Sequence, residues 1–389
     1  MRIGADVSER LDYRPACLFV HEIVRPKYAC AACEAAARPA QIATAPLPPE
    51  PLPRSVAAPG LLAHVIVSKY LDHLPLYRLE SIFGRLGWDV ARSTLCDLML
   101  GCAKVLTPLY ALMGRRVRQS FALHTDDTAL TLLEPRRTAH AWVYVGDALH
   151  PYTVFDLSVG HLQEAPQAFL KNYKGFIHAD GYSGYEALYR AGAVHAACWA
   201  HARRYFYDAR LSDPKRAHEA LARIRTLYAV EAEAKERKLD VLQLQAHRRE
   251  FATPVLAAFG DWLAEQASRV LPKSLIGQAI TYATNQWPAL QTYLQDGRLA
   301  IDNNRAEQAI RPLATGRKNW LHIGGDGGLQ PAAVLLSLAA SVKRHPINPW
   351  DYFRDVLATL PARPPDADLS DLLPDAWARA RAAPSAPAD

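Results

Sequence analysis

The sequence lacks the features that would place the protein in or across a membrane. Its first residues contain no apolar run like the one at the centre of a signal peptide. The longest apolar stretch, around Ala332 to Val342, is shorter than the roughly 20 residues that cross a bilayer as a helix. We therefore expect a cytoplasmic protein.

Cysteine and glycine are also sparse where particular chemistries would need them. Six cysteines in 389 residues are too few for a disulfide framework. No glycine-rich loop of the Walker or dinucleotide-binding kind follows a strand-like segment, which argues against a nucleotide cofactor. The chain is mildly basic, with a formal net charge of +6 and a pI near 8.9, and this favours an anionic partner.

The N-terminal segment contains half of a zinc site. Residues 1–33 alternate apolar and polar residues and end in a Cys-x-x-Cys pair, Cys30 and Cys33. Tetrahedral zinc prefers four ligands, so Zn²⁺ would need Cys17 and His21 as well, and only if the fold brings them close. Otherwise the thiols are reduced cysteines in a loop. We expect a partial zinc-binding module over residues 1–33.

A linker and a helical region follow. Residues 34–59 hold seven prolines and predict a stiff, extended linker. Over residues 60–118 the apolar period becomes helical, with a restart at Pro75 and a third helix from about residue 91 to 113. These helices predict either a helix-turn-helix DNA-binding domain, with Arg78, Arg85 and Arg92 facing phosphates, or a bundle that only packs against its neighbour.

The middle of the chain predicts an α/β core. Residues 119–200 contain five strand-like segments, QSFALHTD, HAWVYVGD, PYTVFDLS, GFIHAD and AVHAACW, with helices expected at 164–173 and 182–191. Three strands joined by short turns, followed by alternating helix and strand, is the order of a ribonuclease-H-like fold. Residues 201–300 predict a helical insertion, residues 301–345 the final part of the core, and residues 346–389 a C-terminal helix and a disordered tail.

Three acids stand where such a core would gather them. Asp126 and Asp180 end two strand-like segments, and Glu307 lies near the start of a helix. Carboxylate oxygens are the ligands that Mg²⁺ and Mn²⁺ prefer, and two such ions can support phosphodiester cleavage. The strand pattern alone does not choose between Asp126 and Asp127, because neighbouring residues face opposite sides.

Each acid also has a structural interpretation. Asp180 could cap the helix expected near residue 182. Asn304 and Glu307 have the spacing of a capping box, and Arg311 lies four residues beyond Glu307, where it could form an ion pair with it. The joint arrangement of the three acids favours the metal-binding interpretation over these separate roles.

Basic residues cluster around the same segments. Those expected to contact DNA phosphates are Arg203, Arg204, Arg311, Arg317 and Lys318, and the alternative is a solvated basic face. Cys198 and His201 form a Cys-x-x-His pair that is either close to the metal site or simply a buried thiol and a hydrogen-bonded imidazole.

A different enzyme would explain two of the same segments. His124 shares a strand face with Asp126, and His178 shares one with Asp180. Nitrogen and oxygen ligands together would suit a zinc or iron phosphatase. If the protein is such a phosphatase, replacement of both histidines would abolish metal binding. If it is a magnesium-dependent enzyme that cleaves DNA strands, the same replacement would leave cleavage largely intact.

Several blocks of the sequence, in order, resemble a known family. HTDDT, HADGYSGY, CWAHARRYF and DNNRAEQAIRPLATGRKNWL are similar to the signature blocks of the insertion sequence 66 family of DDE transposases. The resemblance runs from RIGADVSERLDY to about DYFRDVLATL. By position it implies that Asp126 rather than Asp127 is catalytic, together with Asp180 and Glu307, and that these residues hold two Mg²⁺ or Mn²⁺ ions.

The resemblance also implies an activity and partners. Such a protein hydrolyses DNA at the ends of its element, and the freed 3′-hydroxyl then attacks target DNA. It would work as a homo-oligomer in a synaptic complex, with accessory proteins of the element as further partners, in a bacterial cytoplasm at the nucleoid. Relatives carry a further zinc-binding Cys-x-x-Cys upstream of the segment that matches here. A truncated, catalytically silent DNA-binding remnant is therefore the alternative function.

Overall fold

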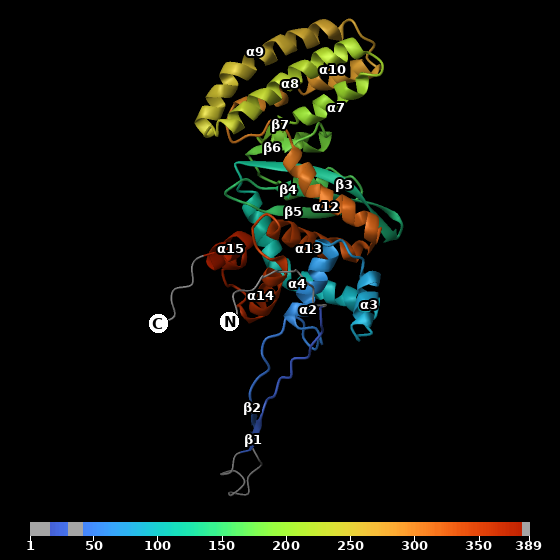
Figure 1. Cartoon of the computed structure of the whole chain (residues 1–389), viewed down its shortest axis with the longest axis vertical. Coiled ribbons are helices and arrows are strands. Elements are labelled where there is room, and N and C mark those ends of the chain that lie inside the picture. Colours follow the sequence, from blue (N-terminus) through green and yellow to red (C-terminus); the bar gives the residue numbers. More distant parts are fainter. Residues whose placement is uncertain (1–15, 30–41, 383–389) are drawn as a thin grey trace, which may run out of the picture.

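The computed structural model describes residues 16–29 and 42–382, and the protein has three layers (Figure 1). A mixed β-sheet lies in the middle, with one group of helices above it and a second group below. A thin ribbon of two short strands extends from the lower helices. These strands are β1 (Lys27–Ala29) and β2 (Ile42–Thr44), which pair in antiparallel fashion. Thus residues 42–44, expected to be linker, are part of this ribbon.

The central sheet has the strand order β5-β4-β3-β6-β7, and β8 pairs with the far end of β3. Strands β3, β4 and β5 are antiparallel neighbours, whereas β6 and β7 run parallel to β3. The five expected strands are all present. The bounds are β3 (Ala122–Glu134), β4 (Arg137–Val145), β5 (Thr153–Val159), β6 (Phe176–Ala179), β7 (Val194–Ala197) and β8 (Ile323–Gly325).

Strand β3 is longer than the sequence suggested. It was expected to end at Asp126 but continues to Glu134, because its second half pairs with β4 as far as Leu132 opposite Arg137. Its parallel pairing with β6 stops at His124. Asp126 therefore lies within a strand, at the point where the neighbouring strand has ended.

Helix α13 (Leu329–Val342) closes the open edge of the sheet at β5. The Ser341 hydroxyl accepts from the backbone N–H of Thr153 at 2.9 Å, and the Ser337 hydroxyl accepts from that of Phe155 at 2.8 Å. The two serines are one helical turn apart and match alternate residues of the strand. They satisfy N–H groups that an unpaired edge strand would otherwise leave free.

Helix α12 (Asn304–Trp320) crosses one face of the sheet, as Figure 1 shows. Its buried residues Ala306, Ile310 and Leu313 pack on apolar side chains of β3, β4 and β5. The other face is covered by α5 (Glu164–Phe169), a single turn η1 (Ser183–Tyr185) and α6 (Glu186–Arg190). The two helices expected between the later strands are thus present but shorter than expected.

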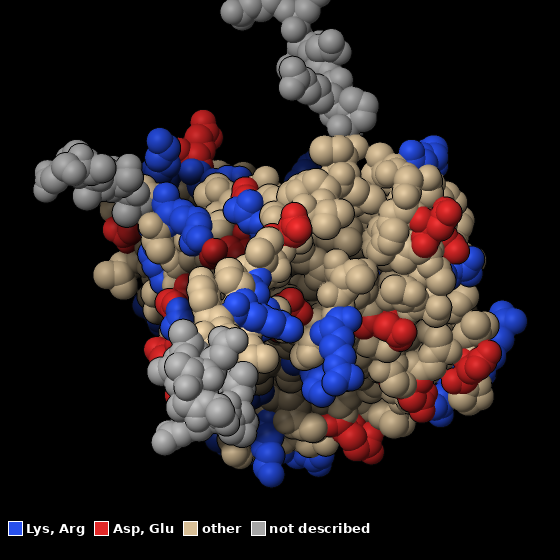
Figure 2. Space-filling model, turned by 90° about the horizontal axis from the view of Figure 1, so that it is seen from below, with Lys and Arg blue, Asp and Glu red and all other residues tan. Residues whose placement is uncertain are grey.

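The lower layer combines segments from both ends of the described chain. It contains α2 (Pro59–Tyr70), α3 (Leu76–Arg85), α4 (Arg92–Val117), α14 (Pro349–Thr359) and α15 (Pro374–Ala382). These helices share a hydrophobic core with the second face of the sheet, so packing accounts for their apolar sides. On the face seen from below, Lys and Arg lie among Asp and Glu rather than in one basic stripe (Figure 2).

Helix α4 is the one described helix that is long and apolar enough to cross a membrane by length and composition. Ten of its residues are buried in the protein, among them Leu106, Leu109 and Met113. They belong to the core that the helix shares with α13 and the sheet. The hydrophobicity of α4 is therefore explained by its place in that core.

The C-terminal part of the described chain differs from the expected disordered tail. Residues 374–382 form α15, and its Trp377 is only 5% exposed. The indole N–H of Trp377 donates to Asp355 at 2.8 Å, and the ring packs edge-on against Tyr352 of α14. The buried tryptophan anchors this otherwise polar, alanine-rich segment to α14.

The upper layer is the expected helical insertion. It comprises α7 (Trp199–Ala209), α8 (Pro214–Glu236), α9 (Val241–Ala267), α10 (Leu275–Asn285) and α11 (Trp287–Gln291). The amphipathic pattern of residues 218–239 and 275–294 predicts helices there, so α8, α10 and α11 were expected, with slightly different ends. Helix α9, with 27 residues, was not; it begins with a capping box between Asp240 and Gln243.

Candidate active site

Asp126 lies within β3, next to the point where the parallel strand β6 ends, and Asp180 directly follows that end. His124 of β3 is directly opposite His178 of β6, and the two imidazole rings stack with centroids 4.2 Å apart. Each aspartate follows its histidine by two residues. The register of the strands thus brings Asp126 beside Asp180, both of them partly exposed where β6 ends.

Asn303 attaches the start of α12 to these strands. Its Oδ1 lies 3.0 Å from Nδ1 of His124, and its Nδ2 donates to the backbone oxygen of Thr125 at 2.8 Å. Its backbone N–H donates to the sulfur of Cys198 at 3.2 Å, and the residue is 1% exposed. Because Glu307 lies one helical turn further on, these three contacts fix the position from which its side chain projects.

Glu307 forms neither the capping box with Asn304 nor the ion pair with Arg311 that the sequence suggested. The N-cap of α12 is Asn303, without a side-chain capping bond, and the amide of Asn304 donates to Asp302 instead. The buried Oε1 of Glu307 has no hydrogen-bond partner within the described residues. The basic side chains within 4 Å of it in the described residues are His201 and Arg204, both at 3.9 Å, and not Arg311, which is exposed.

Asp180 does have a structural contact. One of its carboxylate oxygens accepts from the backbone N–H of Tyr182 at 3.0 Å, which starts the turn before α6. The sequence suggested that Asp180 caps the helix near residue 182. In the structure its carboxylate accepts from the N–H two residues further on, in the turn before that helix, so it fulfils the suggested role in part. The contact occupies one oxygen and fixes the direction of the carboxylate.

Neighbouring acids act electrostatically on Asp126. Burial raises the pKa of Asp126 to about 7, and the charges of Asp180, Asp127 and Glu307 raise it as well. A hydrogen bond from the backbone N–H of Asp127 to the Asp126 carboxylate, at 2.9 Å, acts in the opposite direction. The site therefore has a surplus of negative charge that a bound cation would relieve.

The three carboxylates nevertheless do not form one tight group of ligands. Within the described residues, the sets of ligand atoms that all lie within 4.8 Å of one another are Asp127, His140 and His161, and Cys198, His201 and Glu307. Two metal ions about 3.5–4 Å apart each bind their own subset of ligands. Carboxylates on opposite sides of such a pair can therefore be more than 4.8 Å apart.

Of the two interpretations made from the sequence, Cys198 fits the buried thiol and His201 fits the position close to the candidate metal site. Cys198 is fully buried, and burial raises the pKa of its thiol to about 11, which suits a structural acceptor for the Asn303 N–H. His201 instead stands next to Glu307, and its Nδ1 has no hydrogen-bond partner within the described residues. The cysteine is thus structural in its contacts, whereas the histidine lies at the site.

A basic groove of about 920 Å³ opens beside Glu307, between α7 and α8. The exposed Arg203 and Arg204 line it, and α8 adds Arg225 on the other side. Their contact with DNA stays a prediction. Tyr207 lies in the wall with the guanidinium of Arg210 stacked 3.2 Å from its ring centroid. The groove offers both cations and an aromatic surface next to the candidate site.

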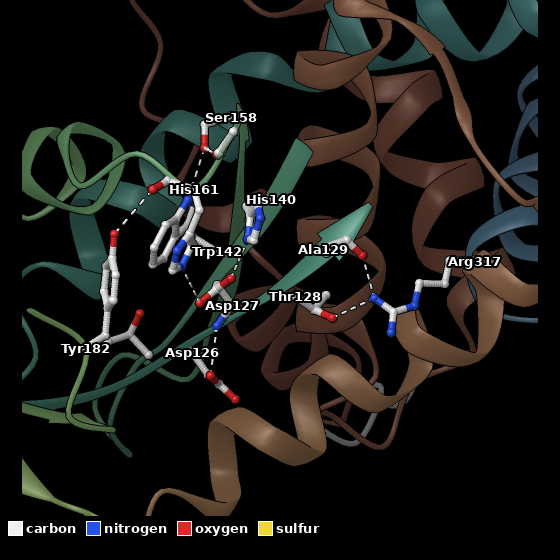
Figure 3. A network of polar contacts seen from close by, with 12 residues as sticks. Asp126, Asp127, Thr128, Ala129, His140, Trp142, Ser158, His161, Tyr182 and Arg317 are labelled. Carbon is white, nitrogen blue, oxygen red and sulfur yellow. Dashed lines mark hydrogen bonds and ion pairs between the residues drawn. The ribbon is translucent and has the colours of Figure 1, made fainter. Parts of the chain in front are cut away.

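The basic residues at the other end of α12 divide into two kinds. Arg317 donates to the hydroxyl of Thr128 at 2.7 Å and to the backbone oxygen of Ala129, so it fastens the helix to β3 (Figure 3). Lys318 and Arg311 are exposed. For Arg317 a structural role therefore stands beside the DNA contact that the sequence suggested.

The histidines of the phosphatase hypothesis are engaged in packing. His124 and His178 are both buried, and burial lowers the pKa of His124 to about 3 and that of His178 well below its usual value. His124 contacts Asn303, and Nε2 of His178 lies 3.4 Å from the backbone N–H of Ala300. Neither histidine belongs to the tight ligand groups of the described residues.

Some residues at the site were missed by the sequence reasoning. Asn303 was not recognised, although its spacing with Ala306 and Ile310, three and seven residues on, places it on the buried side of α12. The pairing of Asp127 with two histidines was not foreseen either, because it depends on the register of three strands. Cys30 and Cys33 lie outside the described residues.

Fold and site together define a mixed α/β protein with two aspartates on neighbouring parallel strands, a glutamate on the helix that crosses them and a basic groove beside that glutamate. Two family models match the chain. One is described as "Transposase IS66 family" and matches residues 54–331, and the other as "zinc-finger binding domain of transposase IS66" and matches residues 1–34. The chain therefore belongs to the IS66 family of transposases, which confirms the resemblance found in the sequence.

Three proteins of Sinorhizobium fredii are similar over nearly the whole chain. The protein y4hP is 31% identical over 98% of this chain and 72% of its own length. The corresponding values are 31%, 96% and 71% for y4qI, and 30%, 97% and 76% for y4jD. All three are called uncharacterized proteins, so they support the kinship and assign no activity.

Proposed function

We propose that the chain is a DDE transposase that cuts DNA at the ends of an insertion sequence and joins those ends to target DNA. The observation that carries the proposal is the electrostatic coupling of Asp126 to Asp180 and Glu307, next to a groove lined by arginines. Membership of the IS66 transposase family supports it independently. In a bacterial cell such a protein would act in the cytoplasm, at the nucleoid.

We further propose a ribonuclease-H-like core. Three antiparallel strands followed by two parallel ones, in the order β5-β4-β3-β6-β7, support it. So does a helix, α12, that brings the third acid across the sheet from a distant part of the sequence. The core would comprise residues 119–200 and 301–345, with the helices of residues 201–300 as an insertion and residues 1–33, 34–59 and 60–118 as zinc module, linker and helical domain.

The residues present fit divalent cations. Asp126, Asp180 and Glu307 would hold Mg²⁺ or Mn²⁺, since their carboxylates are only partly exposed and the charges of the other two help to raise the pKa of Asp126. When bound, two such ions neutralise charge on the phosphodiester and make the attacking hydroxyl more nucleophilic. Zn²⁺ at Cys30 and Cys33 remains a separate expectation.

The protein's own groups position the reactants. Asn303 holds α12 so that Glu307 faces the two aspartates from across the sheet end. Arg203 and Arg204 would neutralise the phosphates on either side of the scissile bond, and Tyr207 would stack on an unpaired base. In this arrangement the groove binds DNA and the three acids act on one bond of it.

The test uses the full-length chain and labelled DNA that carries the ends of its element. Asp126→Asn, Asp180→Asn and Glu307→Gln should each lower cleavage with Mg²⁺ or Mn²⁺ by at least about 100-fold, as expected for loss of a transition-state-stabilising group. DNA affinity should be retained, because no repulsive charge is added. Asp156→Asn is the matched control, a mostly buried aspartate on the opposite face of the sheet.

A cleavage rate within a few-fold of wild type for any one of the three would remove that residue from the site. Binding without cleavage by the wild-type chain, unchanged by Asp180→Asn, would instead identify the DNA-binding remnant. Cleavage by the wild type that is lost only when His124 and His178 are both replaced would favour the histidine-ligated phosphatase site.

A further inference from the structure

A second group of side chains, of types that can ligate a metal ion, lies on the face of the sheet opposite Asp126. Neighbouring residues of a strand face opposite sides, so Asp127 points away from its neighbour, toward the face that carries Trp142. There it meets His140 of β4 and His161, which follows the end of β5 (Figure 3). The proposed transposase chemistry uses none of these three side chains.

The carboxylate of Asp127 bridges the two imidazoles. One of its oxygens lies 2.6 Å from Nδ1 of His140, and the other lies 3.1 Å from Nε2 of His161. One ligand atom from each of the three residues lies within 4.8 Å of the others. Tetrahedral zinc with bonds of about 2.0–2.1 Å separates its ligands by roughly 3.3 Å. The donors therefore need only small shifts to surround one ion.

The surroundings hold both rings in place. Gly160, with φ at 73°, turns the chain back over β4, and its N–H bonds to the backbone oxygen of Thr138. The His161 ring then stacks on the Trp142 indole at an interplanar angle of 1°, and that indole is itself fixed by a bond to Ser158. Such outer contacts orient metal ligands before the ion arrives.

Solvent can reach the three side chains from one side. Their exposed fractions are 21% for Asp127, 15% for His140 and 39% for His161. An ion could therefore enter without unfolding, and water could occupy a fourth position. Two nitrogen donors and one carboxylate favour zinc over magnesium, which prefers oxygen alone.

We propose that Asp127, His140 and His161 bind a Zn²⁺ ion that ties the segment after β5 to the central sheet. The ion would sit on the face opposite the proposed Mg²⁺ site. Through Tyr182, whose hydroxyl lies 3.4 Å from the backbone oxygen of His161, it would also steady the turn that follows Asp180. Its role is structural, and its ligands contain no sulfur.

The experiment measures metal binding rather than DNA cleavage, so its outcome does not depend on the proposed function. Full-length chain freed of metal is titrated with Zn²⁺, and separately with Co²⁺, whose visible spectrum reports the ligands. His161→Ala should weaken binding at this site by more than about 100-fold, since loss of an outer contact alone costs about 10–100-fold. Zn²⁺ should raise the melting temperature of the wild type more than that of His161→Ala.

Two further variants make the result specific. His150→Ala removes a histidine from another pair with an aspartate, Asp147 at 2.9 Å, that belongs to no tight ligand group of the described residues. It should bind Zn²⁺ like the wild type. In a Cys30→Ser, Cys33→Ser chain, Co²⁺ at the proposed site should still give visible bands, without the charge-transfer absorption that thiolate ligands produce.

The proposal fails if His161→Ala and wild type bind equal amounts of Zn²⁺ with equal affinity. It also fails if all bound Co²⁺ shows thiolate absorption and disappears in the Cys30→Ser, Cys33→Ser chain. In either case Asp127 and the two histidines form a hydrogen-bonded network that fixes the segment after β5 without an ion.

Discussion

At the scale of single residues, the surroundings decide what chemically identical side chains can do. Asp126 and Asp127 are neighbours in the same strand, yet Asp126 faces two other acids, whereas Asp127 faces two histidines. Asp126 therefore lies among other negative charges, whereas the carboxylate of Asp127 lies within hydrogen-bonding distance of two imidazoles. The difference comes from the alternation of a β-strand and from nothing in the residues themselves.

The raised pKa of Asp126 predicts how cation binding depends on pH. Below about pH 7 the Asp126 carboxyl must lose its one proton before it can bind an ion, so the affinity of that binding step for Mn²⁺ should rise about tenfold per pH unit and level off above that value. Calorimetric titration at several pH values measures this. Asp156→Asn, the control, should keep the profile, and a flat profile in the wild type would contradict the assignment.

The same pKa has a consequence for the stability of the metal-free protein. A carboxyl group whose pKa is raised in the folded state, here from 3.8 to about 7, binds its proton more tightly when folded. Its stabilising contribution is therefore complete below pH 3.8 and is lost as the pH rises to about 7. Added Mn²⁺ should offset that loss near neutral pH.

Asn303 is predicted to be essential for the position of Glu307. Asn303→Ala leaves the buried Nδ1 of His124 and the backbone oxygen of Thr125 without partners, so it should lower the free energy of unfolding by about 2–5 kcal/mol. Chemical denaturation measures the loss. Asn304→Ala is the control, because its exposed side chain hydrogen-bonds to Asp302, two residues away, and it should change stability by less than about 1 kcal/mol.

At the scale of secondary-structure elements, helices cover a face and an edge of the sheet that the strands alone would leave exposed. Helix α12 covers the face where the acids lie, and α13 covers the free edge of β5 through two serines. An uncovered edge would expose N–H and C=O groups to other chains. The site therefore depends on helices that come late in the sequence and pack on strands formed early in it.

Replacement of the two edge serines should loosen β5. Ser337→Ala and Ser341→Ala each leave a buried backbone N–H without an acceptor, which costs about 1–3 kcal/mol per substitution. Hydrogen exchange at Thr153 and Phe155 should accelerate, as mass spectrometry of the fragments would show. Ser81→Ala, an exposed serine bonded to its own helix, is the control. Unchanged exchange would mean that packing alone holds this edge.

At the scale of the whole molecule, the proposed catalytic residues and the proposed DNA path come from different layers. Asp126 and Asp180 belong to the sheet, whereas the groove belongs to α7 and α8 above it, and Glu307 lies where they meet. The lower face carries mixed charges (Figure 2). The groove is therefore the stronger candidate for phosphate contacts, and the helix-turn-helix role of residues 60–118 stays a prediction.

The groove predicts a specific salt dependence of DNA binding. Arg210→Ala combined with Arg225→Ala should weaken binding to element ends and reduce the slope of log affinity against log salt by about 2, one unit for each lost phosphate contact. The control, Arg237→Ala with Arg269→Ala, removes the same charge from arginines outside the groove. Equal slopes for both double variants would move the DNA path elsewhere.

The sequence by itself determined the elements and the acids. Apolar periodicity fixed the five strands and most of the helices, because it follows from which faces must be buried. It could not give the end of β3 or the order in α15, since these depend on pairing with β4 and on packing against α14, which periodicity does not show. Helix α9 was not expected either, although a local capping box, Asp240 and Gln243, marks its start.

Only the tertiary structure decided how the acids are used. The register of β3 and β6 and the anchor at Asn303 set which carboxylates share a charge environment. The same folding turned Asp127 toward His140 and His161, a grouping with no trace in local spacing. Electrostatic coupling and metal binding act through space over a few ångströms, and a linear sequence does not contain those distances.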